Sequence, residues 1–264
     1  MTIEKRQLSE QNDNFIMLPT VDFCFKELMQ NKEVRKGILS ALLGRNPEEL
    51  EDTELLPTIL QPEYQDEKLG ILDVRVLFAD GTQTDLEMQV VQFDFWPNRV
   101  LFYLGKMYTG QIKRGEPYEK LKKCIHVSIL DFLHFPKDDR CFRKITFCDV
   151  ETGEVYTDLM EIYVLELGKL PTEDRNESGI IRWMRFLSGK CKEDLKKMAE
   201  IPRTKGPAIG LEKNVCSKKP ERDNAPPSSA AIRILGRRIF HIILYSVAAP
   251  SFRKRMRRIL GTGI

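Results

Sequence analysis

The chain has 264 residues with 42% hydrophobic content, which is enough for one large globular domain or one domain with an appendage. Its net charge of +3 hides an asymmetry: residues 201–264 contain 14 Lys and Arg against 3 Asp and Glu, whereas residues 1–200 contain 28 against 36. The acidic body argues against a protein that coats DNA nonspecifically over its whole surface, although a local basic groove is compatible with it.

The cysteines indicate reduced thiols rather than a zinc site or a disulfide framework. The six cysteines show no Cys-x-x-Cys spacing, and none of the three histidines lies near a cysteine in a ligand pattern. Cys124 and Cys148 fall in apolar runs, so we expect both to be buried in a cytoplasmic protein. The N-terminus has no hydrophobic signal core, and the apolar run of residues 239–250 is too short to span a bilayer, so we expect no membrane span.

In chain order, the first predicted elements are helical. We expect a frayed segment over residues 1–14, helices over 21–30 and 33–43, a turn of helix over 47–50 and an edge strand over 55–60. Thr20 can cap the first helix, with Asp22 in its first turn, and Gly44 should end the second. Pro57 weakens the edge strand.

Residues 70–92 predict a β-hairpin with acidic side chains collected on one face. A two-residue turn at Asp80-Gly81 would mix apolar and charged faces, whereas a three-residue loop with Gly81 in the left-handed conformation separates them. In that register the apolar pairs are Leu72 with Met88, Val74 with Leu86 and Val76 with Thr84, and the charged pairs are Asp73 with Glu87 and Arg75 with Asp85.

The hairpin places two carboxylates close together. Directly opposed residues have Cβ atoms about 5 Å apart, so Asp73 and Glu87 would repel each other unless a cation lies between them. Mg²⁺ suits this place because it prefers carboxylate oxygens and retains open positions for water and phosphate. Gln89 lies on the same face as Glu87, two residues further along.

The remaining pattern predicts an α/β sandwich with a mixed sheet. A helix over residues 98–115 carries a second stripe formed by Arg99, Tyr103, Lys106 and Lys113, although Gly105 and Gly110 weaken it. A central strand is expected over 124–132, a hairpin from 143–149 and 154–157, a further strand over 161–167, and helices over 179–187 and 192–199. Tyr103 and Tyr118 are expected to be packing residues. His126 and His134 are expected to be core and loop histidines that no acid recruits. Trp96 either covers the sheet end or stacks on a nucleobase.

The basic tail over residues 201–264 is atypical. Pro, Gly, Ser and Lys dominate residues 202–229, and an apolar run flanked by arginines follows. We favour translation of a shifted reading frame or a degraded gene over a basic arm that binds nucleic acid or anionic lipid.

Five ordered motifs identify a family resemblance. They are Asp22-x-x-Phe25-Lys26, Leu72-Asp73-Val74, Glu87-Met88-Gln89, Arg99-x-x-x-Tyr103 and Gly115-x-x-Tyr118. An acid followed on the next strand by acid-x-lysine resembles the PD-(D/E)XK nuclease superfamily, here with Gln89 in the lysine position. This variant resembles the Rpn family of recombination-promoting nucleases and transposases over residues 15–199. The resemblance implies a restriction-endonuclease-like core, a mixed β-sheet flanked by α-helices, over residues 15–200.

The resemblance also implies hydrolysis of DNA phosphodiester bonds with Mg²⁺ or Mn²⁺ in transposition or recombination. Asp73 and Glu87 would be the metal ligands, and the Met88 carbonyl an additional one by analogy. Gln89 would orient water or hold a phosphate oxygen through its amide. The lysine charge would come from Arg99, Lys106 or Lys26, which would also contact DNA, and Asp22 would add a carboxylate from the first helix.

Three other interpretations remain open. The charged hairpin face is equally typical of a solvated surface ladder, and the same fold could bind DNA without cutting it. A protein-interaction module whose acidic face docks a basic partner is the alternative from another class.

Overall fold

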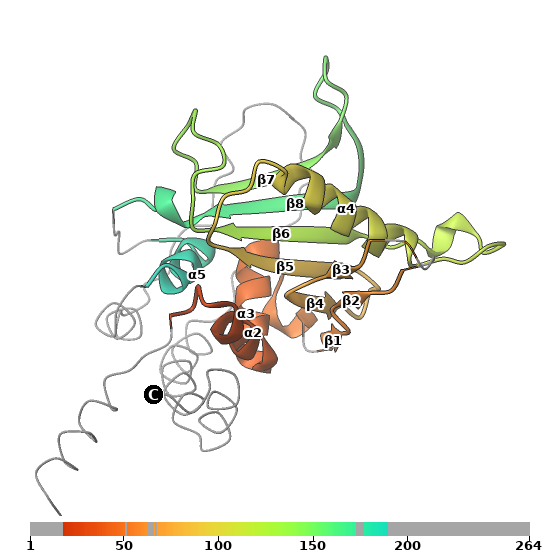
Figure 1. Cartoon of the computed structure of the whole chain (residues 1–264), viewed down its shortest axis with the longest axis horizontal. Helices are drawn as coiled ribbons and strands as arrows, with labels where there is room; N and C mark the ends of the chain where they lie inside the picture. The colour runs from red at the N-terminus through yellow and green to blue at the C-terminus, as the bar shows by residue number, and fades with distance from the viewer. Residues whose placement is uncertain (1–17, 51, 63–65, 67, 173–176, 190–264) are drawn as a thin grey trace, which may run out of the picture.

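The computed structural model describes residues 18–50, 52–62, 66, 68–172 and 177–189, which form an α/β fold around one six-stranded mixed sheet (Figure 1). The strand order is β1 (Glu54–Leu56), β4 (Val74–Leu77), β5 (Gln83–Gln89), β6 (Cys124–Leu130), β8 (Val155–Glu166) and β7 (Phe142–Cys148). Strands β5, β6 and β8 are parallel, and the remaining neighbours pair antiparallel. A second small sheet pairs β2 (Ile59–Leu60) with β3 (Gly70–Ile71).

Helices cover both faces of the large sheet (Figure 1). One face packs against α2 (Asp22–Gln30), α3 (Lys32–Leu43) and α5 (Gly179–Leu187), and the other packs against α4 (Trp96–Thr109). Three short 3₁₀ turns complete the described elements: η1 (Pro47–Leu50), η2 (Tyr118–Lys120) and η3 (Leu167–Lys169). The predicted architecture, a mixed sheet flanked by helices, is confirmed.

The central strands β5 and β6 are buried between the two helical layers. Every residue of β6 is buried, which confirms the central strand predicted from its continuous apolar run. Alternate residues of β5 face opposite layers: Leu86 and Met88 pack in the core beneath α2 and α3, whereas Glu87 faces α4, where Arg99 contacts it. The β5 strand therefore carries its acidic residues into the layer covered by α4.

The predicted hairpin turn is confirmed. The backbone N–H of Gly81 donates to the Phe78 carbonyl at 2.9 Å, and Gly81 has a φ of 84°. The strand pairs Val74–Leu86, Arg75–Asp85 and Val76–Thr84 follow the predicted register. A left-handed glycine thus sets the register that separates the two faces.

The register prediction is wrong at the end of the hairpin. A bend at Asp73 precedes β4, and the ladder begins at Val74. Leu72 therefore packs beneath α4 with Leu104 and Met107 instead of sharing a face with Val74. The bend turns the Asp73 side chain out of regular strand geometry, with consequences for the site.

Several other boundaries differ from the sequence predictions. The N-cap of α2 is Val21 without a side-chain hydrogen bond, so the cap predicted at Thr20 is wrong. Pro57 divides the expected edge strand into β1 and β2. The strand expected over 161–167 is continuous with the preceding one, because β8 is a single long strand that pairs with β7 through register shifts.

Two side chains expected to be buried are exposed. Cys148 lies exposed at the end of β7, although Cys124 is a buried free thiol as predicted, and so is Cys24. Tyr118 is 80% exposed and does not pack in the core, whereas Tyr103 does. The predicted frayed segment, the helix over 192–199 and the basic tail lie outside the described residues.

Candidate active site

Two carboxylates meet where β4 begins beside the end of β5. The backbone N–H of Asp73 donates to Glu87 Oε1 at 2.7 Å, and the backbone N–H of Met88 donates to Asp73 Oδ2 at 3.0 Å. Each acid thus accepts a hydrogen bond from the strand that carries the other. The bend at Asp73 makes this exchange possible because it releases the residue from the β-ladder.

Each carboxylate also meets a cation from a different helical layer. Lys26 Nζ of α2 lies 3.1 Å from Asp73 Oδ1 and 2.7 Å from Asp22 Oδ1. On the opposite face, the Arg99 guanidinium of α4 lies 3.0 Å from Glu87 Oε2. The structure therefore brings together five of the residues named in the sequence analysis, which are Asp22, Lys26, Asp73, Glu87 and Arg99.

Aromatic rings hold Arg99 in place. Its guanidinium lies 5.5 Å from the Trp96 ring centroid and 5.1 Å from that of Tyr103. Trp96 is only 1% exposed and packs with Leu130 of β6. The prediction that Trp96 covers the sheet is confirmed, and its burial removes it from contact with a nucleobase.

The environment of the two acids disfavours negative charge. Burial, with smaller contributions from the Asp85 and Asp73 carboxylates, raises the pKa of Glu87 to about 8. Burial likewise raises the pKa of Asp73, against the attraction of Lys26. Two neighbouring carboxylates with raised pKa values, one buried and one half-buried, form a place where a cation bound between them would be favourable, and their hard oxygens suit a divalent ion.

The sequence analysis paired a second acid on β5, Asp85, with Arg75 and missed its contact with His126. Asp85 Oδ2 lies 2.6 Å from His126 Nδ1, and His126 Nε2 lies 3.0 Å from the Ser128 hydroxyl, all three residues being fully buried beneath α4. Burial lowers the pKa of His126 to about 4 and raises that of Asp85. The expectation that no acid recruits His126 is therefore wrong; the parallel pairing of Asp85 with His126 in β5–β6 brings them together.

We call the paired carboxylates of Asp73 and Glu87 the carboxylate junction. The remaining predicted residues surround this junction less closely. Gln89 ends β5, and its amide donates to the Val91 carbonyl at 2.9 Å. Lys106 lies two turns along α4 from Arg99 and is half-buried. Within the part of the chain that the structure describes, no group of three or more His, Cys, Asp or Glu residues is arranged to hold a metal ion. Any metal site here therefore rests on two carboxylates supplemented by backbone oxygen or water.

A family model for the PD-(D/E)XK nuclease family transposases matches residues 19–218, which include the complete junction of Asp73 and Glu87. The chain belongs to this family. The six-stranded mixed sheet with helices on both faces is consistent with the restriction-endonuclease-like fold of such nucleases. No curated protein and no solved structure gives a significant match.

Membership places the chain among nucleases and transposases, a class that acts on DNA and typically uses divalent metals. The match extends beyond residue 200, the boundary predicted for the nuclease-like domain, as far as residue 218. Among the described residues, no helix combines the length and apolar character needed to cross a bilayer.

Proposed function

We propose that this PD-(D/E)XK family member is a Mg²⁺-dependent DNA endonuclease associated with transposition or recombination, with Mn²⁺ as a possible substitute. The observation that carries the proposal is the reciprocal hydrogen bonding of Asp73 and Glu87, which fixes a half-buried and a buried carboxylate side by side with a cation on each flank. A surface charge ladder would leave such acids solvated, whereas Glu87 is 2% exposed.

Asp73 and Glu87 would hold the metal, with the Met88 carbonyl as a further ligand. When bound, the ion supplies charge neutralisation at the scissile phosphate and lowers the pKa of water. The raised pKa of Glu87 means that this side chain must give up its proton before its carboxylate can serve as a ligand. Asp22, which is 63% exposed, would act through Lys26, whose ammonium it holds from the solvent side.

Lys26 is the best-placed replacement for the superfamily lysine. Its Nζ lies 3.1 Å from an oxygen of Asp73, so its charge is already at the carboxylate junction. Arg99 is held by Glu87 and by two aromatic rings, which suits it to orient Glu87 and to meet a phosphate at its exposed edge. Lys106 would contact the DNA backbone further along α4, and Gln89 would orient water or a phosphate oxygen through its amide.

A second candidate function is DNA binding without cleavage. It is favoured by Gln89, which carries no charge and whose amide donates to the Val91 carbonyl of its own loop. A protein-interaction module has less support, because the acidic face is largely buried beneath α4.

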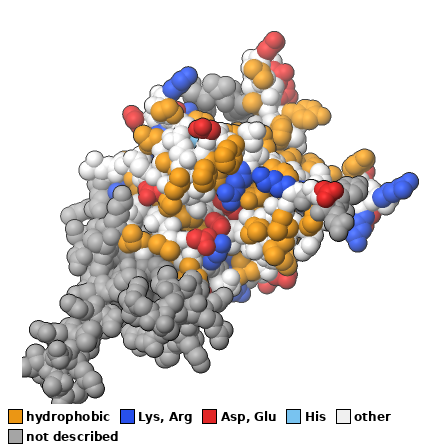
Figure 2. Space-filling model, viewed as in Figure 1, with side chains coloured by type: hydrophobic (Ala, Val, Ile, Leu, Met, Phe, Trp, Pro, Cys, Tyr) orange, Lys and Arg blue, Asp and Glu red, His pale blue; other side chains and the backbone are white. Residues whose placement is uncertain are grey.

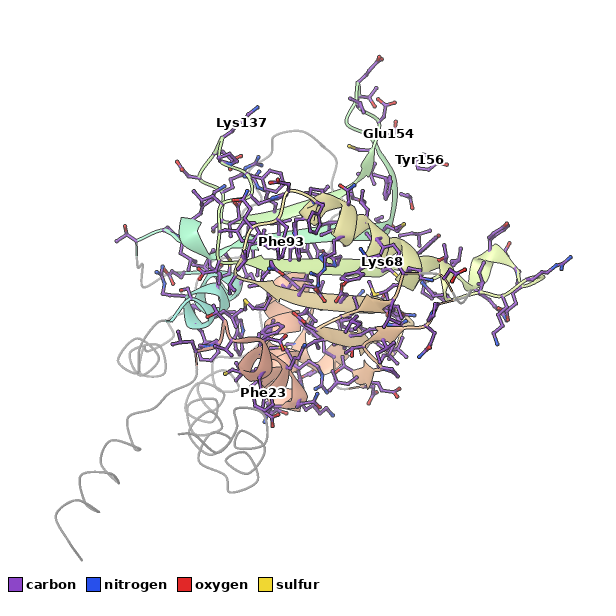
Figure 3. The ribbon with its side chains drawn as sticks, in the orientation of Figure 1. Phe23, Lys68, Phe93, Lys137, Glu154 and Tyr156 are labelled. Carbon is purple, nitrogen blue, oxygen red and sulfur yellow. The ribbon has the colours of Figure 1, made fainter. Side chains whose placement is uncertain are left out.

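The test is nicking of supercoiled plasmid at low salt with Mg²⁺, Mn²⁺ or EDTA. Asp73→Asn and Glu87→Gln keep the side-chain shape and remove the charge, so both should abolish metal-dependent nicking. Glu154→Gln is the matched control, because Glu154 is exposed on the β7–β8 hairpin, away from the junction (Figure 3).

The outcomes separate the candidates. Nicking by the wild type and by Glu154→Gln, lost in both site variants, supports the endonuclease and its two ligands together. Metal-independent DNA binding without nicking favours the second candidate. Nicking that survives both substitutions contradicts the site. The comparison should include a chain ending near residue 200, because we also propose that residues 201–264 are dispensable for activity.

A further inference from the structure

An exposed aromatic pair lies on the loop that leaves the candidate active site. The rings of Phe93 and Phe95 are stacked, with centroids 5.4 Å apart and planes inclined by 16°. Phe95 is 60% exposed, and its neighbours Val90 and Val91 are 48% and 56% exposed. Solvent-exposed apolar groups concentrated in one short loop indicate a binding surface for a ligand or a macromolecular partner.

The loop is attached to the carboxylate junction at both ends. At its start, Gln89 ends β5 and donates its side-chain amide to the Val91 carbonyl at 2.9 Å. At its end, the backbone N–H of Arg99 donates to the Phe95 carbonyl at 3.1 Å, while the Arg99 guanidinium contacts Glu87. Two short hydrogen-bonded connections therefore hold the loop, with its aromatic pair, beside the proposed metal ligands.

A cation lies beside the apolar loop. Arg99 lies on the first turn of α4, directly after the loop, and is 31% exposed. Figure 3 shows Phe93 over the large sheet, whereas Lys137 lies on a protruding loop and Glu154 and Tyr156 lie on the β7–β8 hairpin. Figure 2 shows hydrophobic and basic side chains adjacent to each other on this face. A protein partner would be expected to cover a broader apolar patch, whereas aromatic rings beside positive charge match a single-stranded nucleic acid.

We propose that Phe93 and Phe95 form a stacking platform for unpaired DNA bases, so that the substrate class is single-stranded or locally melted DNA. This inference rests on the proposed function, since it names the form of DNA that the site accepts. The faces of the bases in an intact duplex stack on one another, so no ring face is free for Phe95. An unpaired base offers such a face, and its flanking phosphates would meet Arg99.

The test is fluorescence anisotropy in EDTA with a labelled single-stranded oligonucleotide, the same strand carrying consecutive abasic sites, and the corresponding duplex. Abasic sites retain the phosphates and remove the stacking faces. The wild type should bind the intact strand about tenfold or more tighter than the abasic strand, as expected from the stacking of one or two bases. Phe93→Leu with Phe95→Leu retains apolar bulk, and this variant should bind both strands with the weaker affinity.

Phe95→Trp should preserve the preference for intact bases, which keeps the test informative if the double variant folds poorly. Tyr156→Leu is the matched aromatic control, because Tyr156 is 87% exposed on the distant β7–β8 hairpin and should leave binding unchanged. Equal affinity of the wild type for intact and abasic strands overturns the platform, even if plasmid nicking proceeds. An equal loss for both strands in the leucine variant, or a change in self-association instead of DNA binding, also overturns it. Failure of the wild type to bind any of the three DNAs overturns the proposed function as well.

Discussion

Lys26→Met removes the cation proposed to replace the superfamily lysine, and it should slow cleavage without unfolding the protein. Lys26 Nζ lies 3.1 Å from Asp73 Oδ1, a separation that corresponds to about 5 kcal/mol at an effective dielectric constant of 20. Lys26 is 37% exposed, so solvent screening lowers this value to about 3 kcal/mol. If that energy acts on the charge that develops in the transition state, kcat should fall about a hundredfold.

The assay is single-turnover nicking of plasmid, with Mn²⁺ affinity measured in parallel. A loss of charge near the transition state lowers the rate, whereas Mn²⁺ affinity should stay constant or rise, because Asp73 no longer shares its oxygen with an ammonium group. Lys137→Met is the control, since Lys137 is exposed on a distant loop (Figure 3).

The decisive variant combines Lys26→Met with Gln89→Lys. Gln89 follows Glu87 by two residues on the same face of β5, so a lysine there would return the charge to the strand position used in the superfamily. We expect the double variant to recover to within about tenfold of the wild-type rate. Wild-type activity in Lys26→Met, or no recovery in the double variant, would refute the reasoning.

Four further predictions concern the buried charges and the hairpin. In EDTA, the free energy of unfolding should fall by up to about 2 kcal/mol between pH 6.5 and 8, because folded Glu87 retains a proton that the unfolded chain has lost. Chemical denaturation at several pH values should show a smaller fall of this free energy with pH in Glu87→Gln. The same proton must leave on metal binding, so Mn²⁺ affinity measured by calorimetry should rise with pH up to about 8. His126→Ala leaves the buried Asp85 carboxyl group without its hydrogen-bond partner and should cost about 1–3 kcal/mol in urea unfolding; a loss below about 1 kcal/mol would show that the pair contributes little. Gly81→Ala forces a side chain into a φ of 84° with its Cβ 2.9 Å from Lys122, so the melting temperature should drop by an amount equivalent to about 1–2 kcal/mol.

The hairpin was predictable because its determinants are local. The period-2 pattern of β4 and β5 and a glycine able to adopt positive φ are both visible in the sequence, and together they select one register. The bend at Asp73 was not predictable from that pattern. It follows from the packing of Leu72 beneath α4, a contact between segments about thirty residues apart.

The pair formed by Asp85 and His126 was missed for the same reason. Its formation depends on parallel pairing of β5 with β6, and the whole of α4 lies between these strands in the chain. A histidine in an otherwise apolar central strand was the available signal, because a fully buried imidazole requires hydrogen-bond partners. The alternation of β5 places Asp85 on the same face as Glu87, so Asp85 was the nearest candidate for a hydrogen-bond partner of His126.

The positive charges of this site come from two helices and not from the strand that carries Glu87. A lysine on β5 would be placed by the strand itself, whereas Lys26 and Arg99 approach from α2 and α4, on opposite faces of the sheet. Asp73 lies between the two layers: its backbone N–H contacts Glu87, which faces α4, and its side chain contacts Lys26 of α2. The electrostatics of the site therefore depend on correct docking of both helices, and a substitution that loosens either helix should lower activity before it unfolds the sheet. Moving the charge back to position 89 would remove the dependence on α2, so the Gln89→Lys chain should tolerate substitutions in the core beneath α2 that inactivate the wild type.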